Sequence, residues 1–177
     1  MKSKSSPNQQ ALFFKVSDIT PLGKFLLVAR SQGIVQVEFI SADQEIDALL
    51  SAPVAYDQAE DTPWLAQANR ELLEYFSGSR KQFTLPIDWS GIPPFQKKVL
   101  QATQKIPFGG TRTYTEIAQE VGQAQAVRAV GQAEARNPIP IIIPCHRVIG
   151  NDGKLHGYGA PGGIKTKAWL LHFEGAL

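Results

Sequence analysis

The segment IPIIIPCHRVIG (residues 139–150) places the only cysteine of the chain next to a histidine and an arginine. A thiolate at Cys145 would be a strong nucleophile, but an ordinary thiol is only slightly ionised near neutral pH. His146 and Arg147 are the groups at hand to assist its ionisation. The residues alone leave two interpretations open: a nucleophile, or a small side chain buried at the end of an apolar run.

We do not expect His146 to face Cys145 directly. Residues 139–143 are predicted to form a buried extended segment, with Pro140 and Pro144 restricting its pairing. Consecutive residues of an extended segment point to opposite sides. We therefore expect a water to link the thiol and the imidazole, with a distant acid holding the imidazole tautomer.

Composition describes an ordinary globular chain of 177 residues, with 43% hydrophobic and 19% charged residues. One cysteine cannot form an internal disulfide, and with three histidines it is a poor ligand set for zinc, so we expect no metal. Residues 1–10 are predicted to be a disordered tail without a signal peptide, and no run reaches the roughly 20 apolar residues of a membrane span. These features favour a cytoplasmic protein with no membrane partner.

Charge is distributed unevenly along the chain. Residues 1–90 carry 8 Lys and Arg against 11 Asp and Glu, a net −3, whereas residues 91–177 carry 10 against 5, a net +5. This asymmetry suggests that the second half meets a polyanion, although a solvated basic face would give the same count.

The first half of the chain predicts an antiparallel sheet followed by a helix. Apolar and β-branched residues dominate three predicted strands at residues 12–19, 23–30 and 33–40. A helix follows, capped by Asp61 or Thr62 and ended by Gly78, with an apolar stripe of Trp64, Ala68, Leu72 and Phe76. We predict a domain at residues 11–86 and a proline-rich and glycine-rich linker at residues 87–94.

The second half, residues 95–177, predicts a helical domain. Helical patterns cover residues 95–106, 113–122 and 126–137, and Thr113 with Glu116 has the spacing of a capping box. The last two helices, joined around Gly122, are typical of a helix-turn-helix or of an ordinary helical hairpin.

The last of these helices has a face of small residues, Ala126, Ala129, Gly131 and Ala133, with Arg128 as its long cation. Such a helix lacks the long polar side chains that read bases in a major groove. It could fit a minor groove with Arg128 entering the duplex, or it could pack tightly against another helix.

Several ordered motifs resemble one known family. TYTEIA, RAVG, NPIPIII, PCHRVIG, GYGAPGG and KAWLLHFEG, between Phe95 and Gly175, resemble the O6-alkylguanine-DNA alkyltransferases, or methylated-DNA–protein-cysteine methyltransferases. TPLGKFLLVARSQGIVQVEF (residues 20–39) resembles the first domain of that family. The resemblance implies an α+β fold: a ribonuclease H-like domain with a three-stranded antiparallel sheet and a helix, then a helical winged helix-turn-helix domain that binds DNA.

The resemblance also implies an activity. The protein would transfer a methyl or other alkyl group from O6-alkylguanine, and less efficiently from O4-alkylthymine, in duplex DNA to its own Cys145. The nucleotide would be flipped out of the duplex, and sulfur would attack the alkyl carbon in line. Because the product is a stable thioether, the protein would act once, as a monomer, with no cofactor and no obligate protein partner, in the cytoplasm or in a eukaryotic nucleus.

The resemblance assigns roles to matching positions. Cys145 is the alkyl acceptor, His146 deprotonates it through a water, Glu174 orients His146, and Tyr114 hydrogen-bonds the departing guanine at N3. Arg128 fills the gap left in the base stack, and Asn137 links the recognition helix to the active-site segment. The remaining matches are DNA contacts at Thr113, Ala126, Ala129 and Gly131, and a base pocket at Val148, Tyr158, Gly159 and Ala160.

The chain departs from the family pattern in three places. GYGAPGG is two residues longer than the common form of the pocket loop, and HFEG has Phe173 where histidine usually precedes the glutamate. Residues 1–90 contain neither cysteine nor histidine, so the zinc site of some members is not expected.

Three other functions compete with alkyl transfer. A lesion sensor of the same fold would bind alkylguanine without reacting, but Cys145 argues against it. A cysteine hydrolase would need a histidine that faces Cys145. A winged-helix regulator would carry base-reading side chains on its recognition helix.

Overall fold

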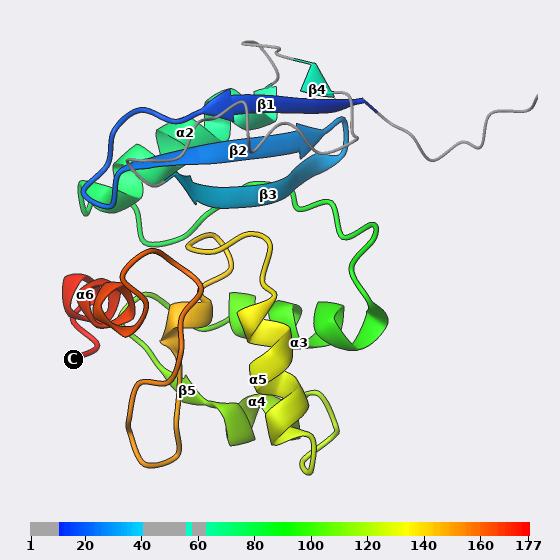
Figure 1. Cartoon of the computed structure of the whole chain (residues 1–177), viewed down its shortest axis with the longest axis vertical. Coiled ribbons are helices and arrows are strands. Elements are labelled where there is room, and N and C mark those ends of the chain that lie inside the picture. Colours follow the sequence, from blue (N-terminus) through cyan, green and yellow to red (C-terminus); the bar gives the residue numbers. More distant parts are fainter. Residues whose placement is uncertain (1–10, 41–55, 58–62) are drawn as a thin grey trace, which may run out of the picture. The chain divides into compact units, whose positions relative to one another are not determined.

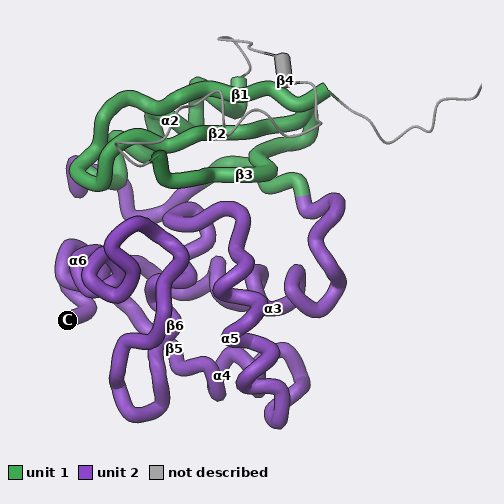
Figure 2. The backbone as a smooth tube through the Cα atoms, in the orientation of Figure 1, with its two compact units in different colours: residues 1–76, 84–88 green, residues 77–83, 89–177 purple. Residues whose placement is uncertain are grey.

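The computed structural model describes residues 11–40, 56–57 and 63–177, arranged in two compact units. One unit comprises residues 1–76 and 84–88, and the other comprises residues 77–83 and 89–177 (Figure 2). The chain therefore crosses between the units more than once. The predicted tail at residues 1–10 and the predicted helix caps Asp61 and Thr62 lie outside the described residues.

The first unit contains a four-stranded sheet in the order β3-β2-β1-β4 (Figure 1). The three predicted strands are confirmed: β1 (Leu12–Val16), β2 (Lys24–Arg30) and β3 (Gly33–Ile40) pair antiparallel in sequence order. Strand β4 (Tyr56–Asp57), which was not predicted, pairs parallel to β1. Two residues are too few to show the alternation that predicts a strand.

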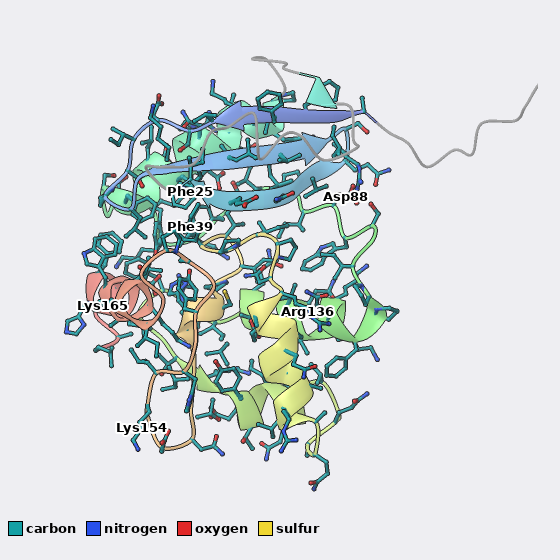
Figure 3. The ribbon with its side chains drawn as sticks, in the orientation of Figure 1. Phe25, Phe39, Asp88, Arg136, Lys154 and Lys165 are labelled. Atoms are coloured by element: carbon teal, nitrogen blue, oxygen red, sulfur yellow. The ribbon has the colours of Figure 1, made fainter. Side chains whose placement is uncertain are left out.

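Helix α2 (Pro63–Phe76) covers one face of this sheet (Figure 1). Phe25 on β2 and Phe39 on β3 lie next to each other (Figure 3), with ring centroids 4.8 Å apart. The Phe25 ring also lies 6.0 Å from that of Phe76, so aromatic contacts join two strands to the helix. The predicted apolar stripe is largely buried, but Trp64 is only half-buried and its indole N–H donates to the Ser31 carbonyl at 3.0 Å.

Residues 84–88 belong to the first unit and lie beside β3 at the edge of the sheet. The Ile34 N–H donates to the Pro86 carbonyl at 2.9 Å, and the Asp88 N–H donates to the Ile34 carbonyl at 2.9 Å. Gly33 has a φ of 151°, and a Cβ added there would lie 2.4 Å from the Pro86 carbonyl oxygen. Only glycine allows this close approach of two backbones.

The second unit is helical. Its elements are α3 (Pro94–Gln104), β5 (Arg112–Thr113), α4 (Tyr114–Glu120), α5 (Val127–Ala135), the 3₁₀ turn η1 (Cys145–Arg147), β6 (Val148–Ile149) and α6 (Ile164–Glu174). The predicted capping box at the start of α4 is confirmed, because the Glu116 N–H donates to Thr113 Oγ1 and the Glu116 carboxylate accepts from the Thr113 N–H. Helices α3, α4 and α5 pack around one core, built on Val99, Ile106, Ile117, Val130 and Val148.

Two short elements complete this unit. Strands β5 and β6 pair parallel, which places the start of α4 beside the segment that follows Cys145. The loop after β6 extends away from the helices, with Lys154 near its far end (Figure 3). No helix among the described residues is long and apolar enough to cross a membrane.

Replacing Gly33 with alanine should destabilise the first unit. The added Cβ would collide with the Pro86 carbonyl oxygen, so we expect a loss of about 3 kcal/mol, measured by urea unfolding. Gly23→Ala is the matched control in the same unit, because Gly23 also has a positive φ, 91°, but the nearest atom to the added Cβ, the Ile40 carbonyl oxygen, lies at an ordinary 3.7 Å. It should cost only about 1 kcal/mol. Equal losses at both positions would contradict the clash.

Candidate active site

The backbone before Cys145 forms a tight turn. The predicted extended segment at residues 139–143 is wrong: the Ile143 N–H donates to the Ile139 carbonyl at 2.9 Å, and Ile141 has a φ of 71°. Asn137 closes this turn, since its Nδ2 donates to the Ile143 carbonyl at 2.8 Å and its Oδ1 accepts from the Ile139 N–H at 3.0 Å. Side-chain bonds of this kind compete with extended pairing and override the apolar pattern.

The positive φ of Ile141 is a strained conformation, because a β-branched residue is rarely found there. Strain of this kind costs of the order of 1–3 kcal/mol and persists only where the surroundings enforce it. The isoleucine side chains at 139, 141, 142 and 143 are all buried. Burial and the Asn137 bonds thus fix the path of the chain into Cys145.

Cys145 begins the turn η1 and is only 7% exposed. Burial, together with the nearby Glu134 carboxyl, raises the pKa of the thiol to about 12, and a hydrogen bond with the Asn137 side chain and the positive charge of Lys167 oppose the shift in part. Almost none of the free thiol is ionised at neutral pH, so a reaction at this sulfur requires a base.

A buried ion cluster lies beside the cysteine. The imidazole Nε2 of His146 lies 2.9 Å from Glu174 Oε1, and Arg147 holds the same carboxylate with Nε at 2.8 Å and Nη2 at 2.9 Å. Arg147 Nη1 also donates to the Ile106 carbonyl at 2.6 Å. Helix α6 thus carries the acid, and η1 carries both of its partners.

The protonation of this cluster follows from its bonds. Burial would raise the pKa of Glu174, but the bonds from His146 and Arg147 outweigh it and lower the pKa to about 2. Burial lowers the pKa of His146 despite the carboxylate, so its imidazole is neutral at neutral pH. Its one proton then lies on Nε2 toward Glu174, and Nδ1, which has no hydrogen-bond partner among the described residues, is left as a free acceptor.

The sequence-based reason for separating Cys145 from His146 was wrong, because the two residues lie in a 3₁₀ turn and not in an extended segment. The separation itself remains, since His146 Nε2 is directed at Glu174 and Nδ1 makes no bond to the thiol.

An aromatic cluster covers the arginine of this site. Phe173, the departure from the usual family motif, stacks on Trp169 at 5.3 Å and meets the edge of Phe108 at 6.2 Å. The Arg147 guanidinium lies 5.9 Å from the Phe108 ring centroid. Phe108 is therefore the ring that lies over Arg147, and Phe173 packs against Phe108 and Trp169 rather than against the ion pair.

An open cavity of about 650 Å³ lies between α4, α5 and the loop after β6. Five predicted site residues line it: Tyr114, Arg128, Gly131, Tyr158 and Gly159. The Tyr158 ring also meets the His146 ring edge-on at 6.4 Å, which links this cavity to the buried cluster.

Other predicted site residues lie elsewhere in the unit. Val148 belongs to the hydrophobic core, and Ala160 is buried inside its loop, so neither lines the cavity. Thr113 caps α4, Ala126 precedes α5 as its N-cap residue, and Ala129 is exposed on α5.

The extended GYGAPGG loop has a defined turn. The Gly163 N–H donates to the Ala160 carbonyl at 2.9 Å, and the Thr166 hydroxyl donates to the Pro161 carbonyl. The positive φ values of Gly162 and Gly163, 81° and 54°, allow the chain to enter α6 directly.

A buried lysine that was not predicted lies beside the cavity. Lys167 is 1% exposed, and its Nζ donates to the Val148 carbonyl at 2.6 Å and to the His156 carbonyl at 3.4 Å. The same ammonium lies 5.7 Å from the Tyr114 ring centroid. The signal was present in the sequence, because Lys167, Leu171 and Glu174 share one face of a helix by their spacing.

A buried carboxyl was missed as well. Glu134 on α5 is 6% exposed and bonds to the Thr103 hydroxyl on α3. Burial raises its pKa to about 7, although Thr103 and the charge of Lys167 oppose the shift. Among the described residues, no group of three or more His, Cys, Asp and Glu side chains is arranged to hold a metal.

The low pKa of Glu174 makes stability depend on pH in the acid range. Its folded pKa, about 2, lies below the ordinary 4.5, so its contribution is complete above about pH 5 and is lost as the pH falls toward about 2. We expect a loss of about 3 kcal/mol over this range, measured by urea unfolding with tryptophan fluorescence. Glu174→Gln should be less stable at neutral pH but should depend less on pH in this window; an equally steep dependence would contradict the assignment.

The chain matches two family models and several named relatives along most of its length. Residues 94–176 match the family model described as the DNA binding domain of 6-O-methylguanine DNA methyltransferase, and residues 19–89 match that of its ribonuclease-like domain. A constitutive methylated-DNA–protein-cysteine methyltransferase of Bacillus subtilis is 45% identical over 157 residues, covering 88% of this chain and 91% of the relative. A relative with the same activity name from Methanosarcina barkeri is 43% identical over 155 residues, covering 88% and 92%.

Solved structures of a related protein superpose on most of this chain. The crystal structure of Mycobacterium tuberculosis O6-methylguanine methyltransferase superposes with a TM-score of 0.77 at 35% identity, covering 93% of each chain. A structure of the M. tuberculosis protein in complex with DNA superposes with a TM-score of 0.75 at 36% identity, covering 94% of this chain and 93% of the other. With both domain models matched in order and close relatives aligned along most of its length, this chain belongs to the methylated-DNA–protein-cysteine methyltransferase family.

Proposed function

We propose that this protein repairs alkylated DNA by transferring the alkyl group of O6-alkylguanine irreversibly to the sulfur of Cys145. The observation that carries the proposal is the buried cysteine beside a neutral histidine whose Nδ1 is a free acceptor and whose Nε2 is held by Glu174. The named relatives support the same reaction class.

The reaction begins with the thiol proton. Nδ1 of His146 accepts this proton through one water, and Glu174 stabilises the imidazolium that results. The Cys145 sulfur then attacks the alkyl carbon in line, a carbon–sulfur bond forms, and the bond between that carbon and guanine O6 breaks. The electron pair leaves on guanine as an anion, which the Tyr114 hydroxyl stabilises by donating to N3.

The product explains why the protein acts once. A thioether at Cys145 has no carbonyl for water to attack, and thiol exchange does not undo it. The step requires no cofactor, because the thiol is consumed as the second reactant. Each molecule therefore removes one alkyl group.

The burial of Cys145 requires the damaged nucleotide to leave the duplex. Flipping a base costs a few kcal/mol, less for a weakly paired damaged base. We assign the cavity between α4, α5 and the loop after β6 to the flipped base, with Tyr158 and Gly159 on its wall. The exposed Arg128 on α5 would fill the vacated stack.

The outer face of α5 fits a minor groove. Ala129 is small and exposed on α5, so the helix backbone can come close to the duplex there, while Gly131 faces the adjoining cavity. The net +5 of residues 91–177 attracts the phosphate backbone. We assign DNA binding and catalysis to residues 95–177, a supporting domain to residues 11–86 and a linker to residues 87–94.

The cellular setting follows from this chemistry. A reduced thiol and a DNA substrate are consistent with a monomer that works in the cytoplasm, or in the nucleus of a eukaryotic cell. Asn137, which bonds the turn before Cys145, would couple movements of α5 on DNA to the reactive sulfur.

Incubation with a duplex that contains one O6-methylguanine should add the mass of one methyl group to the intact protein. Peptide mapping should locate the methyl on Cys145, with one transfer per molecule. Cys145→Ser is the matched control and should acquire no methyl while still binding the duplex. No adduct on folded protein would favour a lesion sensor, and repeated turnover would favour a hydrolase.

Arg128→Ala should slow repair of duplex DNA at least about tenfold, because the variant cannot fill the gap that the flipped base leaves in the stack. A tenfold change corresponds to about 1.4 kcal/mol, the size expected for the loss of one contact. Reaction with free O6-methylguanine base should be nearly unchanged, since no stack has to be filled. Arg70→Ala, on α2 in the first unit, removes the same charge as a control. Equal slowing with duplex and free base would contradict the role of Arg128.

A further inference from the structure

The carboxyl of Glu134 is buried in the second unit but takes no part in the mechanism above. It lies on the inner face of α5 with Val130 and Ala133, and its Oε2 has no hydrogen-bond partner among the described residues. A buried carboxyl with an unsatisfied oxygen costs free energy, most of all when it is ionised. Stability alone does not account for a glutamate at this position.

The hydrogen bond between the Glu134 carboxyl and Thr103 accommodates both protonation states of the acid. The Thr103 hydroxyl has a single proton and lies within bonding distance of two acceptors, Glu134 Oε1 and the Val99 carbonyl at 3.1 Å. When Glu134 is a neutral acid, it donates to Thr103, which donates to Val99. When Glu134 is a carboxylate, the Thr103 hydroxyl turns and donates to Oε1, and the acid proton has left to solvent.

Four elements surround this carboxyl with groups of the active site. Thr103 on α3 makes its bond, Tyr114 on α4 and Cys145 on η1 lie within its electrostatic reach, and Lys167 on α6 supplies the opposing charge. A carboxylate here raises the pKa of both the Tyr114 hydroxyl and the Cys145 thiol, in each case after burial. Both effects oppose the reaction, since sulfur and guanine each become negative during it.

We propose that Glu134 is a positioning residue that regulates Cys145: as a neutral acid it permits a thiolate to form, and as a carboxylate it opposes the thiolate. The inference rests on the proposed alkyl transfer to Cys145. The charge of Glu134 also acts against the guanine anion beside Tyr114. Repair by this protein is therefore restrained at alkaline pH, where an ordinary thiol would become more reactive.

The raised pKa of Glu134, about 7, sets the range in which the restraint appears. Below about pH 6 the acid is neutral, and Glu134→Gln should transfer methyl groups at nearly the rate of the unmodified protein. Above about pH 8 the carboxylate is present only in the unmodified protein, and Glu134→Gln should be faster by about tenfold, the effect of one pKa unit on the thiol. Transfer is measured in single turnover with duplex O6-methylguanine and, in parallel, with the free base.

Two further variants test the charge of Glu134 and its hydrogen bond to Thr103. Glu134→Met removes the charge and keeps the length of the side chain, so it should show the same alkaline gain and serves if the glutamine variant folds poorly. Thr103→Val removes the bond that lowers the Glu134 pKa, so the restraint should begin at a higher pH. Glu120→Gln, which removes an ion-paired carboxylate on α4, should have the unmodified pH profile.

A second readout separates this inference from the proposed function. Iodoacetamide alkylates thiolates without DNA, and Cys145 is the only thiol of the chain, so its modification rate reports the same restraint. The rate ratio of Glu134→Gln to unmodified protein should rise with pH in this assay too. A ratio that stays constant with pH, or a slower variant at alkaline pH, would overturn the role of Glu134. Absence of methyl transfer with a rising iodoacetamide ratio would instead overturn the proposed repair function.

Discussion

The second unit depends on one buried interaction, in which Arg147 and His146 bind the carboxylate of Glu174. A buried carboxylate is stable only when its charge is paired and its oxygens are bonded. Arg147 meets both requirements and also binds the Ile106 carbonyl after α3, so the charge pair joins η1, α6 and the end of α3. His146 can then remain neutral with its proton on Nε2, because the charge of the carboxylate is already balanced. The free Nδ1 acceptor of His146 is a consequence of this pairing.

The candidate active site both fixes the position of Cys145 and limits the ionisation of its thiol. The bonds of Asn137 and the burial of the neighbouring isoleucines hold Ile141 in a strained conformation, which fixes the path of the chain into Cys145. Burial keeps the thiol protonated until a base acts, which under the proposed mechanism protects a thiol that reacts only once. Glu134 and Lys167 add opposite charges around that thiol, so its reactivity reflects a balance of buried charges as well as a base.

Much of the fold followed from local patterns. The strands β1 to β3, helix α2 and the capped helix α4 have strong signals in the sequence, and each appears where the pattern indicated. The two failures have different causes, a local side-chain bond in one case and a long-range strand pairing in the other. Residues 139–143 are apolar like a strand, but the Asn137 side chain folds them into a turn. Strand β4 forms by pairing with β1, and two residues are too few for a sequence pattern to predict a strand.

The sequence by itself determined the family and the order of the two domains, and it singled out Cys145 as the proposed acceptor, because ordered motifs around PCHRVIG depend only on residue identity and spacing. Only the tertiary structure decided which side chains share the buried volume around that cysteine. Arg147, Lys167 and Glu134 are ordinary charged residues in the sequence, and they come from η1, α6 and α5. Their protonation depends on burial and on partners far away in the chain, and these quantities exist only once the helices have packed.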